Sequence, residues 1–337
     1  MKTPLYTILA LTTLLATARA VPATDTGYEM YAAVAMTKAQ KNSSTPADSG
    51  LYVRQQDGSW DIFGPRVLGV YSVAIQPGSD GQVMLIACAD GIVRSTDAGK
   101  SWRLTTGWDV IDVRTFAFNP VNPDEIYAST CWGPLRSIDG GATWSQAQAG
   151  LHLLYAQSII ADTQTAGRVL LGTEDGIYLS KDGAKTWART DSPPATALRL
   201  VQSSVNPNLL LAGTQGRGAW ISHDAGESWT QVDPDSATAN LYAAALDTHD
   251  VNRMAVGGWG PGVRVSNDGG KTWVDRSAGL PVRNVFVLAF DPGKPGRLWA
   301  STFEEGTFFS DDLGVTWQDG GLYGAFGFDF VFVPVQP

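Results

Sequence analysis

The chain has 337 residues, of which 44% are hydrophobic and only 17% are charged. This composition is too apolar for a disordered chain and too lightly charged for a coiled coil. Acidic residues outnumber basic ones by 33 to 24, a formal net charge of −9. We therefore do not expect a nucleic-acid partner, because capture of phosphates requires a basic surface. The 37 Gly and 18 Pro residues favour turns, so the composition indicates a β-rich, turn-dense fold.

The first twenty residues have the layout of a secretory signal peptide. Lys2 supplies a positive start, residues 5–16 form a short apolar run, and residues 18–20 fit the small-x-small cleavage rule. The apolar run is too short to span a bilayer as a helix, and no later segment offers about 18 consecutive apolar residues. We therefore expect a periplasmic or extracellular protein without a membrane span, whose mature part, residues 21–337, is one domain.

Seven tryptophans recur every 42 to 44 residues, at positions 60, 102, 144, 187, 229, 273 and 317. A period of this length is typical of solenoids and propellers. Six of them end a motif S-x-D-x-G-x-[ST]-W, whose first copy spans residues 95–102, while the copy at residues 50–60 is degenerate and one residue short. The aspartates of the six copies are Asp97, Asp139, Asp182, Asp224, Asp268 and Asp312.

Each period predicts four strands. In the second repeat, residues 70–75 and 83–87 are apolar, and residues 91–97 and 101–106 alternate as strands on either side of the motif. The motif is then a hairpin turn in which Asp and Ser accept and donate local hydrogen bonds and Gly takes a positive φ. Four strands in about 43 residues make a propeller blade. We expect the six aspartates to be structural and not to bind Ca²⁺, since the oxygen-rich D-x-D-x-D loop is absent.

The two ends of the chain predict how the ring closes. Residues 27–35, 51–55 and 60–63 look like the second, third and fourth strands of a first blade, and residues 326–333 look like an innermost strand. We predict an all-β, seven-bladed propeller closed by adding this C-terminal strand to the N-terminal blade. The alternative is six blades with residues 21–65 as an extension. Residues 37–49 are polar and predict a surface loop, which contains the glycosylation sequon at Asn42.

The motif resembles the Asp-box repeat of bacterial neuraminidases, and its six copies are called Asp-box segments below. The same repeat occurs in sialidases, other glycosidases, sorting receptors and photosystem assembly factors. A single exported seven-bladed ring is similar to the photosystem II stability/assembly factor type. The resemblance implies that ligands bind over the central channel, on the face opposite the Asp-box segments.

That face is built from second-to-third and fourth-to-first loops, which carry several aromatic and basic side chains. The candidates for ligand binding are Arg66, Trp108, Trp132, Arg217, Trp259, Arg283 and Tyr323. Aromatic platforms beside Arg suit a carbohydrate or a peptide, although the same residues could simply pack loop against loop. We favour a non-catalytic binding, scaffold or assembly role for a monomer, with a protein or a carbohydrate as the ligand.

The alternative is a glycoside hydrolase, which needs two carboxylates about 5 to 9.5 Å apart. Candidates on the same loops are Glu174 or Asp175 with Glu304 or Glu305, and Asp109 with Asp112. A sialidase would also need three convergent arginines, for which the chain offers Arg66, Arg114, Arg199, Arg217 and Arg283. The Arg-Ile-Pro signature of that family is absent, and xyloglucan-type glycosidases carry two such propellers where this chain has room for one.

Cysteine and histidine indicate little further chemistry. Cys88 and Cys131 fall near the ends of second strands in neighbouring repeats, so either a disulfide between blades or two free thiols is compatible with the sequence. The three histidines, at positions 152, 223 and 249, have no metal-binding spacing. No metal and no other cofactor is expected.

Overall fold

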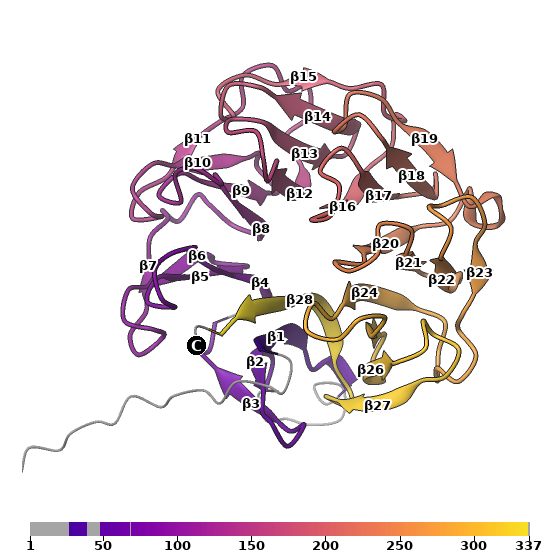
Figure 1. Ribbon diagram of the computed structural model, residues 1–337. Helices are drawn as coiled ribbons and strands as arrows, with labels where there is room; N and C mark the ends of the chain where they lie inside the picture. Colours follow the sequence, from indigo (N-terminus) through magenta and orange to yellow (C-terminus); the bar gives the residue numbers. More distant parts are fainter. Residues whose placement is uncertain (1–26, 39–47, 68, 336–337) are drawn as a thin grey trace, which may run out of the picture.

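The structure is a computed structural model that describes residues 27–38, 48–67 and 69–335. Seven four-stranded antiparallel sheets surround a central axis, so the chain is an all-β, seven-bladed propeller (Figure 1). Helix is confined in these residues to a turn at residues 37–38 and a 3-10 helix, η1 (Pro234–Ser236). The predicted signal peptide, most of the predicted loop 37–49 and the Asn42 sequon lie outside the described residues.

Each blade is given from its innermost to its outermost strand. Blade 1 is β28 (Phe326–Pro334), β1 (Tyr28–Ala35), β2 (Gly50–Arg54) and β3 (Trp60–Phe63). Blade 2 is β4 (Val70–Ile75), β5 (Met84–Cys88), β6 (Gly91–Ser95) and β7 (Arg103–Leu104). Blade 3 is β8 (Val113–Phe118), β9 (Ile126–Thr130), β10 (Leu135–Ser137) and β11 (Ser145–Gln146). Blade 4 is β12 (Ala156–Ala161), β13 (Val169–Thr173), β14 (Gly176–Ser180) and β15 (Ala188–Arg189).

The remaining blades follow the same order. Blade 5 is β16 (Ala197–Gln202), β17 (Leu210–Thr214), β18 (Ala219–Ser222) and β19 (Thr230–Val232). Blade 6 is β20 (Leu241–Leu246), β21 (Met254–Gly258), β22 (Gly262–Ser266) and β23 (Val274–Asp275). Blade 7 is β24 (Val285–Phe290), β25 (Leu298–Thr302), β26 (Gly306–Ser310) and β27 (Gln318–Gly321).

Burial falls from the middle of each blade to its rim. Every residue of the second strands β5, β9, β13, β17, β21 and β25 is buried, because both faces of these strands pack against neighbouring blades. Their sequences accordingly do not alternate between apolar and polar residues, and they begin with apolar runs such as Val169–Leu171 in β13. The outermost strands β7, β11, β15 and β23 are two residues long and exposed, which leaves little free edge for pairing with other chains.

The ring closes in blade 1. Strands β1 and β28 pair antiparallel from Tyr28 opposite Pro334 to Ala35 opposite Phe326. Strands β1, β2 and β3 are thus part of the ring, and the six-bladed alternative is wrong. The seam between blades 7 and 1 is filled by Trp299, which is 1% exposed and lies 6.5 Å from Trp60 between ring centroids. The indole Nε1 of Trp60 donates to the carbonyl of Gly320 at 2.7 Å.

The Asp-box segments form hairpin turns held by one repeated set of hydrogen bonds. In blade 4, Ser180 Oγ donates to Asp182 Oδ1 at 2.8 Å and accepts from the Ala184 amide at 2.9 Å. Thr186 donates to Asp182 through both its amide (2.9 Å) and its hydroxyl (2.6 Å). Equivalent contacts bind Asp97, Asp139, Asp224, Asp268 and Asp312. Both oxygens of each carboxylate are thus engaged within the turn.

Cys88 and Cys131 are free thiols, so the disulfide alternative is not the one found. Cys88 is buried, with Sγ 3.3 Å from the Gly91 carbonyl, and Cys131 is partly exposed, with Sγ 3.5 Å from the Ile111 carbonyl. Within the described ranges, no helix has the length and apolarity needed to cross a membrane. The same residues contain no cluster of three or more His, Cys, Asp or Glu side chains suited to a metal ion.

Candidate functional site

The seven innermost strands share one irregularity near their starts. In β8, Val113 pairs with Thr130 and Thr115 pairs with Ser129, so Arg114 is an extra residue without a partner on β9. The other six innermost strands are irregular at the equivalent place. The extra residues are Tyr71, Arg114, Gln157, Leu198, Tyr242, Phe286 and Phe328. Such bulges re-aim a side chain, and here they turn one side chain per blade toward the axis.

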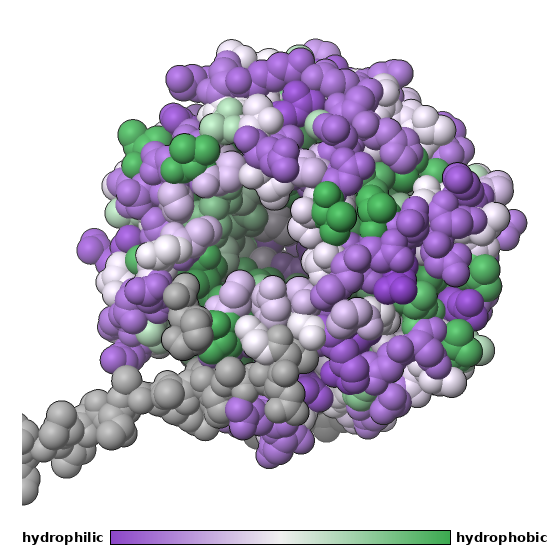
Figure 2. Space-filling view, in the orientation of Figure 1, coloured by the Kyte–Doolittle hydropathy of each residue, from purple (hydrophilic) through white to green (hydrophobic). Residues whose placement is uncertain are grey.

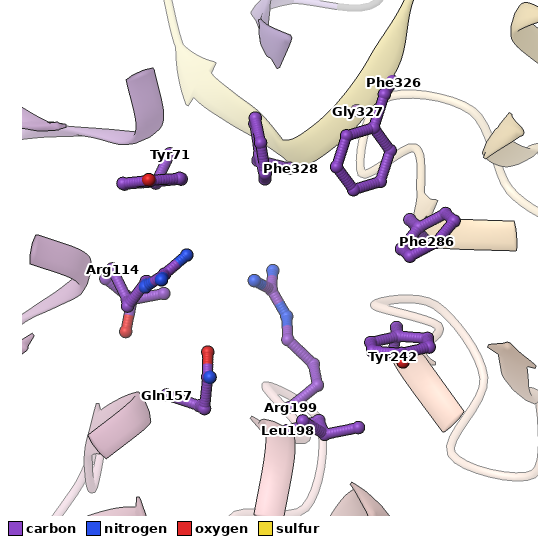
Figure 3. Close-up of a pocket in the computed structure, with 11 residues that line it drawn as sticks. Tyr71, Arg114, Gln157, Leu198, Arg199, Tyr242, Phe286, Phe326, Gly327 and Phe328 are labelled. Atoms are coloured by element: carbon purple, nitrogen blue, oxygen red, sulfur yellow. The ribbon is translucent and has the colours of Figure 1, made fainter. Parts of the chain in front are cut away.

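These seven side chains line one cavity at the mouth of the central channel. It has a volume of about 230 Å³ and is completed by Thr115, Arg199, Phe326 and Gly327; we call it the mouth cavity (Figure 3). The innermost strands begin here and the Asp-box turns lie at the other end of each sheet, so the cavity is on the face opposite the Asp-box segments. The space-filling view shows the ring hollowed at its centre (Figure 2).

Aromatic rings form a continuous wall around one part of the cavity. The ring centroids of Phe286 and Phe326 are 4.4 Å apart, those of Phe326 and Phe328 are 4.7 Å apart, and those of Phe328 and Tyr71 are 4.9 Å apart. Tyr242 joins the wall 4.9 Å from Phe286. At the rim, the half-exposed Trp259 lies 5.8 Å from Phe286 and so extends the wall to the surface.

Arg114 begins the polar part of the cavity. Its guanidinium lies over the ring of Tyr71, 4.3 Å from the centroid. The Tyr71 hydroxyl donates to Asp112 Oδ1 at 2.8 Å, and burial together with this hydrogen bond raises the pKa of Tyr71 to about 12. Arg114 Nη2 is 3.7 Å from the same oxygen, too far for a hydrogen bond, and Arg114 Nε is buried without a partner.

An ion pair forms the floor. Arg199 Nη2 of blade 5 contacts Asp329 Oδ1 of blade 1 at 2.7 Å, and Ser72 of blade 2 donates to Asp329 Oδ2 at 2.6 Å. Asp329 is buried, and both its oxygens are occupied. Below the pair, a second cavity of about 490 Å³ is lined by Arg199, Asp329 and the ends of the innermost strands on the Asp-box side. The pair therefore lies between the two cavities of the central channel.

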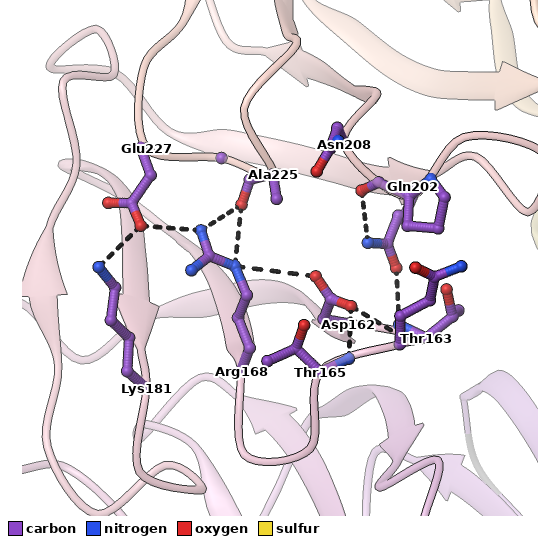
Figure 4. A network of polar contacts seen from close by, with 12 residues as sticks. Asp162, Thr163, Thr165, Arg168, Lys181, Gln202, Asn208, Ala225 and Glu227 are labelled. Atoms are coloured by element: carbon purple, nitrogen blue, oxygen red, sulfur yellow. Dashed lines mark hydrogen bonds and ion pairs between the residues drawn. The ribbon is translucent and has the colours of Figure 1, made fainter.

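A cavity of about 300 Å³ on the Asp-box side also carries acidic residues (Figure 4). Its guanidinium, Arg168, donates to the Ala225 carbonyl at 2.7 Å and to Glu227 Oε1 at 3.1 Å. Lys181 contacts the same Glu227 oxygen at 2.7 Å, while Asp162 accepts the amides of Gln164 and Thr165. The contacts of Arg168 and Lys181 with Ala225 and Glu227 join blade 4 to blade 5, so Glu227 has a structural role.

The seven candidates for ligand binding all lie in loops of the face that carries the mouth cavity, but none lines that cavity. Trp108, Trp132 and Tyr323 are 94%, 58% and 70% exposed, and Arg217 is exposed as well. Arg66 pairs with Asp48 at 2.6 Å. Arg283 donates to the Gly260 and Pro261 carbonyls of the β21–β22 loop and to Asp275, so it joins its own loop to a neighbouring one. Trp259 touches the aromatic wall.

The candidate carboxylates are also absent from the lining of the cavity, although Asp112 borders it through its contact with Tyr71. Asp175 accepts from Thr173 Oγ1 at 2.7 Å and from the Tyr178 hydroxyl at 2.9 Å, while Glu305 pairs with Lys38 at 2.7 Å. Glu174, Glu304 and Asp109 are loop residues outside the lining. Of the five arginines considered for a convergent set, Arg114 and Arg199 share the mouth cavity, and Arg66, Arg217 and Arg283 do not.

Sequence reasoning missed the aromatic wall. Alternation along a strand does not predict it, since alternation turns each residue toward a neighbouring sheet rather than toward the axis. The available signal is positional: the second residue of the innermost strand is larger than the first in six of the repeats, where it is Tyr71, Arg114, Gln157, Leu198, Tyr242 and Phe286.

Comparison with known proteins shows the fold. No model of a known protein family matches the chain. The oligoxyloglucan-reducing end-specific xyloglucanase of Emericella nidulans is 27% identical over 157 residues, which cover 42% of this chain and 19% of that protein. The GH74 enzyme of Niastella koreensis superposes with a TM-score of 0.69 and 19% identity over 80% of this chain and 50% of its own. The chain therefore spans at most half of these relatives.

Solved propellers of the chain's own size are also similar. YCF48 bound to a D1 peptide superposes with a TM-score of 0.58 and 19% identity, covering 76% of this chain and 83% of that one. YCF48 of Cyanidioschyzon merolae superposes with a TM-score of 0.56 and 14% identity over 74% and 84% of the two chains. The seven-bladed repeat propeller is therefore shared with both YCF48 and GH74 proteins.

Proposed function

We propose that this chain is an exported, monomeric, non-catalytic binding propeller that takes a protein or glycan ligand at the mouth cavity. One observation carries the proposal: among the residues described by the structure, those lining this cavity include aromatic, Arg and Gln side chains but no Asp or Glu. A cavity with aromatic walls and a few convergent polar groups is typical of a ligand-binding site.

The requirements of glycoside hydrolysis also support a non-catalytic role for the mouth cavity. That reaction needs one carboxyl group as acid and a second as nucleophile or base, on either side of the sugar. The nearest carboxylate below the cavity, Asp329, is held by Arg199 and Ser72, and Asp112 at the edge accepts from Tyr71. These contacts suit a structural role for the carboxylates of Asp329 and Asp112 rather than a role in proton transfer.

The glycoside hydrolase remains the second candidate, and one observation favours it: the 157-residue match to a xyloglucanase. The chain covers half of the Niastella koreensis enzyme, whereas it superposes with YCF48 over most of both chains.

The experiment compares turnover with binding. The purified mature chain is incubated with xyloglucan oligosaccharides and a panel of chromogenic glycosides, and the same glycans and candidate proteins are tested for retention on the immobilised chain. We expect retention without hydrolysis, and loss of retention in Phe286→Ala. Hydrolysis abolished by Glu174→Gln or Glu304→Gln would overturn the proposal. Export is tested separately by sequencing the secreted chain, which should begin at Val21.

A further inference from the structure

The mouth cavity has two unlike parts, an aromatic wall and a guanidinium-bearing wall, within about 230 Å³. We propose that it binds a flat apolar ring carrying a carboxylate on a short stem. This chemistry occurs in free aromatic acids and in peptides whose last residue is aromatic. The inference rests on the proposed binding function and names the group that the ring recognises.

The wall and the volume indicate the ring. Phe286, Phe326 and Phe328 stand edge to face in succession, so a further flat ring can continue the series by the same preferred geometry. An apolar cavity of roughly 150 Å³ holds benzene, and drug-sized ligands need roughly 300 Å³ or more. The volume of the mouth cavity lies between these values, which fits one ring with a short polar stem.

Arg114 and Arg199 indicate which charge a ligand of the mouth cavity carries. Aromatic walls alone would suit a cation, but Arg114 and Arg199 both point into this cavity and would repel one (Figure 3). Arg199 is already paired with Asp329, whereas Arg114 has only the Asp112 contact at 3.7 Å and a buried Nε without a partner. Within the described residues no hydrogen bond reaches the Nη groups of Arg114, so an acceptor in the cavity can pair with them.

The geometry of Arg114 favours a carboxylate as that acceptor. One face of its guanidinium is covered by Tyr71, and its edge carries the N–H donors that a ligand can bind. The edge of a guanidinium offers parallel N–H donors that match the two oxygens of a carboxylate. Gln157, on the neighbouring blade, adds a neutral amide to the same wall. Ring and acid group can thus be held at once, on opposite parts of the cavity.

The test measures affinity for matched acids and amides by isothermal titration calorimetry on the full chain. The probes are 3-phenylpropionate and its amide, the peptide Gly-Gly-Phe and its C-terminal amide, and glucuronate as an acid without an aromatic ring. We expect each aromatic acid to bind at least about tenfold more tightly than its amide, since hydrogen bonds to charged groups are the stronger ones. Comparison of phenylpropionate with the peptide distinguishes a free acid from a chain end.

Variants locate the site. Arg114→Gln should weaken binding of the acid about tenfold and leave the amide unchanged, and Phe286→Ala should weaken both. Arg103→Gln, at an exposed arginine on the outermost strand β7 and outside the cavity, is the matched control and should change neither. Thermal unfolding of each variant separates loss of the ligand from loss of the fold.

Three results would overturn the inference: equal affinity for acid and amide, unchanged acid binding in Arg114→Gln, or no binding of any aromatic acid at millimolar concentration. Retention of a neutral glycan that Phe286→Ala abolishes would overturn the carboxylate while leaving the proposed binding function intact. Hydrolysis of a glycoside would instead overturn the proposed function.

Discussion

Arg199 and Asp329 lie on innermost strands of non-adjacent blades, and their side chains meet in the central channel with Nη2 and Oδ1 2.7 Å apart. Asp329 also accepts a hydrogen bond from Ser72, on the blade next to its own. Three blades are therefore joined through one buried carboxylate. Propeller blades otherwise contact their neighbours in the ring, so this contact links parts that packing alone leaves independent.

Removal of one partner of this ion pair should destabilise the fold. Arg199→Met leaves the charge of Asp329, which is 5% exposed, without its cation. Loss of one partner of a fully buried pair costs about 3 to 5 kcal/mol, and the partial exposure of Arg199 reduces the expected loss to about 2 to 3 kcal/mol. Urea unfolding measures the change.

Two further variants test whether the unpaired buried charge of Asp329 causes the loss of stability. Arg199→Met combined with Asp329→Leu should recover most of the lost stability, because no buried charge is then left unpaired. Arg66→Met, which breaks the exposed pair with Asp48, should change the free energy of unfolding by less than about 1 kcal/mol. Equal effects of Arg199→Met and Arg66→Met would show that the channel pair contributes no more than a surface pair.

Deletion of β28 should prevent the ring from closing. A chain that stops at residue 325 loses the partner of β1 over Tyr28–Ala35 and exposes the edge of blade 1. An exposed strand edge invites pairing with other chains, so we expect aggregation, measured by size-exclusion chromatography. Addition of a synthetic peptide of residues 326–337 should increase the monomeric fraction. A monomeric truncated chain with an unchanged unfolding curve would show that closure is dispensable.

The Asp-box turns should make stability depend on acid pH. Hydrogen bonds from Thr186, first through its side chain, lower the pKa of Asp182 to about 2, and Ser101 and Thr272 do the same for Asp97 and Asp268. An unfolded Asp titrates near about 3.9, so these carboxylates bind protons in the unfolded chain first. Their contribution is complete above about pH 4 and is lost as the pH falls toward about 2.

Urea unfolding of the wild type between pH 7 and pH 3 should therefore show stability falling on the acid side. Asp182→Asn cannot take up that proton, so its stability should fall less steeply below about pH 4. Thr186→Val removes one donor and should cost about 1 kcal/mol at neutral pH. A wild-type stability that is constant down to pH 3 would contradict the role of these turns.

The two thiols should differ in reactivity. Cys88 is buried and Cys131 is partly exposed, and burial raises the pKa of both. A chromogenic disulfide reagent should therefore titrate one thiol in the native protein, slowly, and two after denaturation. Cys131→Ser should abolish the native signal. Absence of any thiol after denaturation would show that the protein carries the disulfide instead.

The fold could be predicted because its signals are local. The spacing from Trp60 to Trp317 sets the number of blades, and the similarity of residues 326–333 to residues 285–290 identifies the closing strand. The site could not be predicted, because the orientation of Phe286 depends on a bulge in the pairing of β24 with β25. The contact of Arg199 with Asp329, 130 residues apart, depends on the curvature of the whole ring.

Strand β28 follows every other strand of the ring in the chain, and its partner β1 precedes them all. During synthesis, blades 2 to 7 can form one after another, but they remain an open arc until β28 has left the ribosome. The floor of the channel is absent from that arc as well, because Asp329 lies on the same strand. A nascent chain therefore has neither a finished ring nor a finished binding site, and both are acquired in one step after nearly all of the strands have been made.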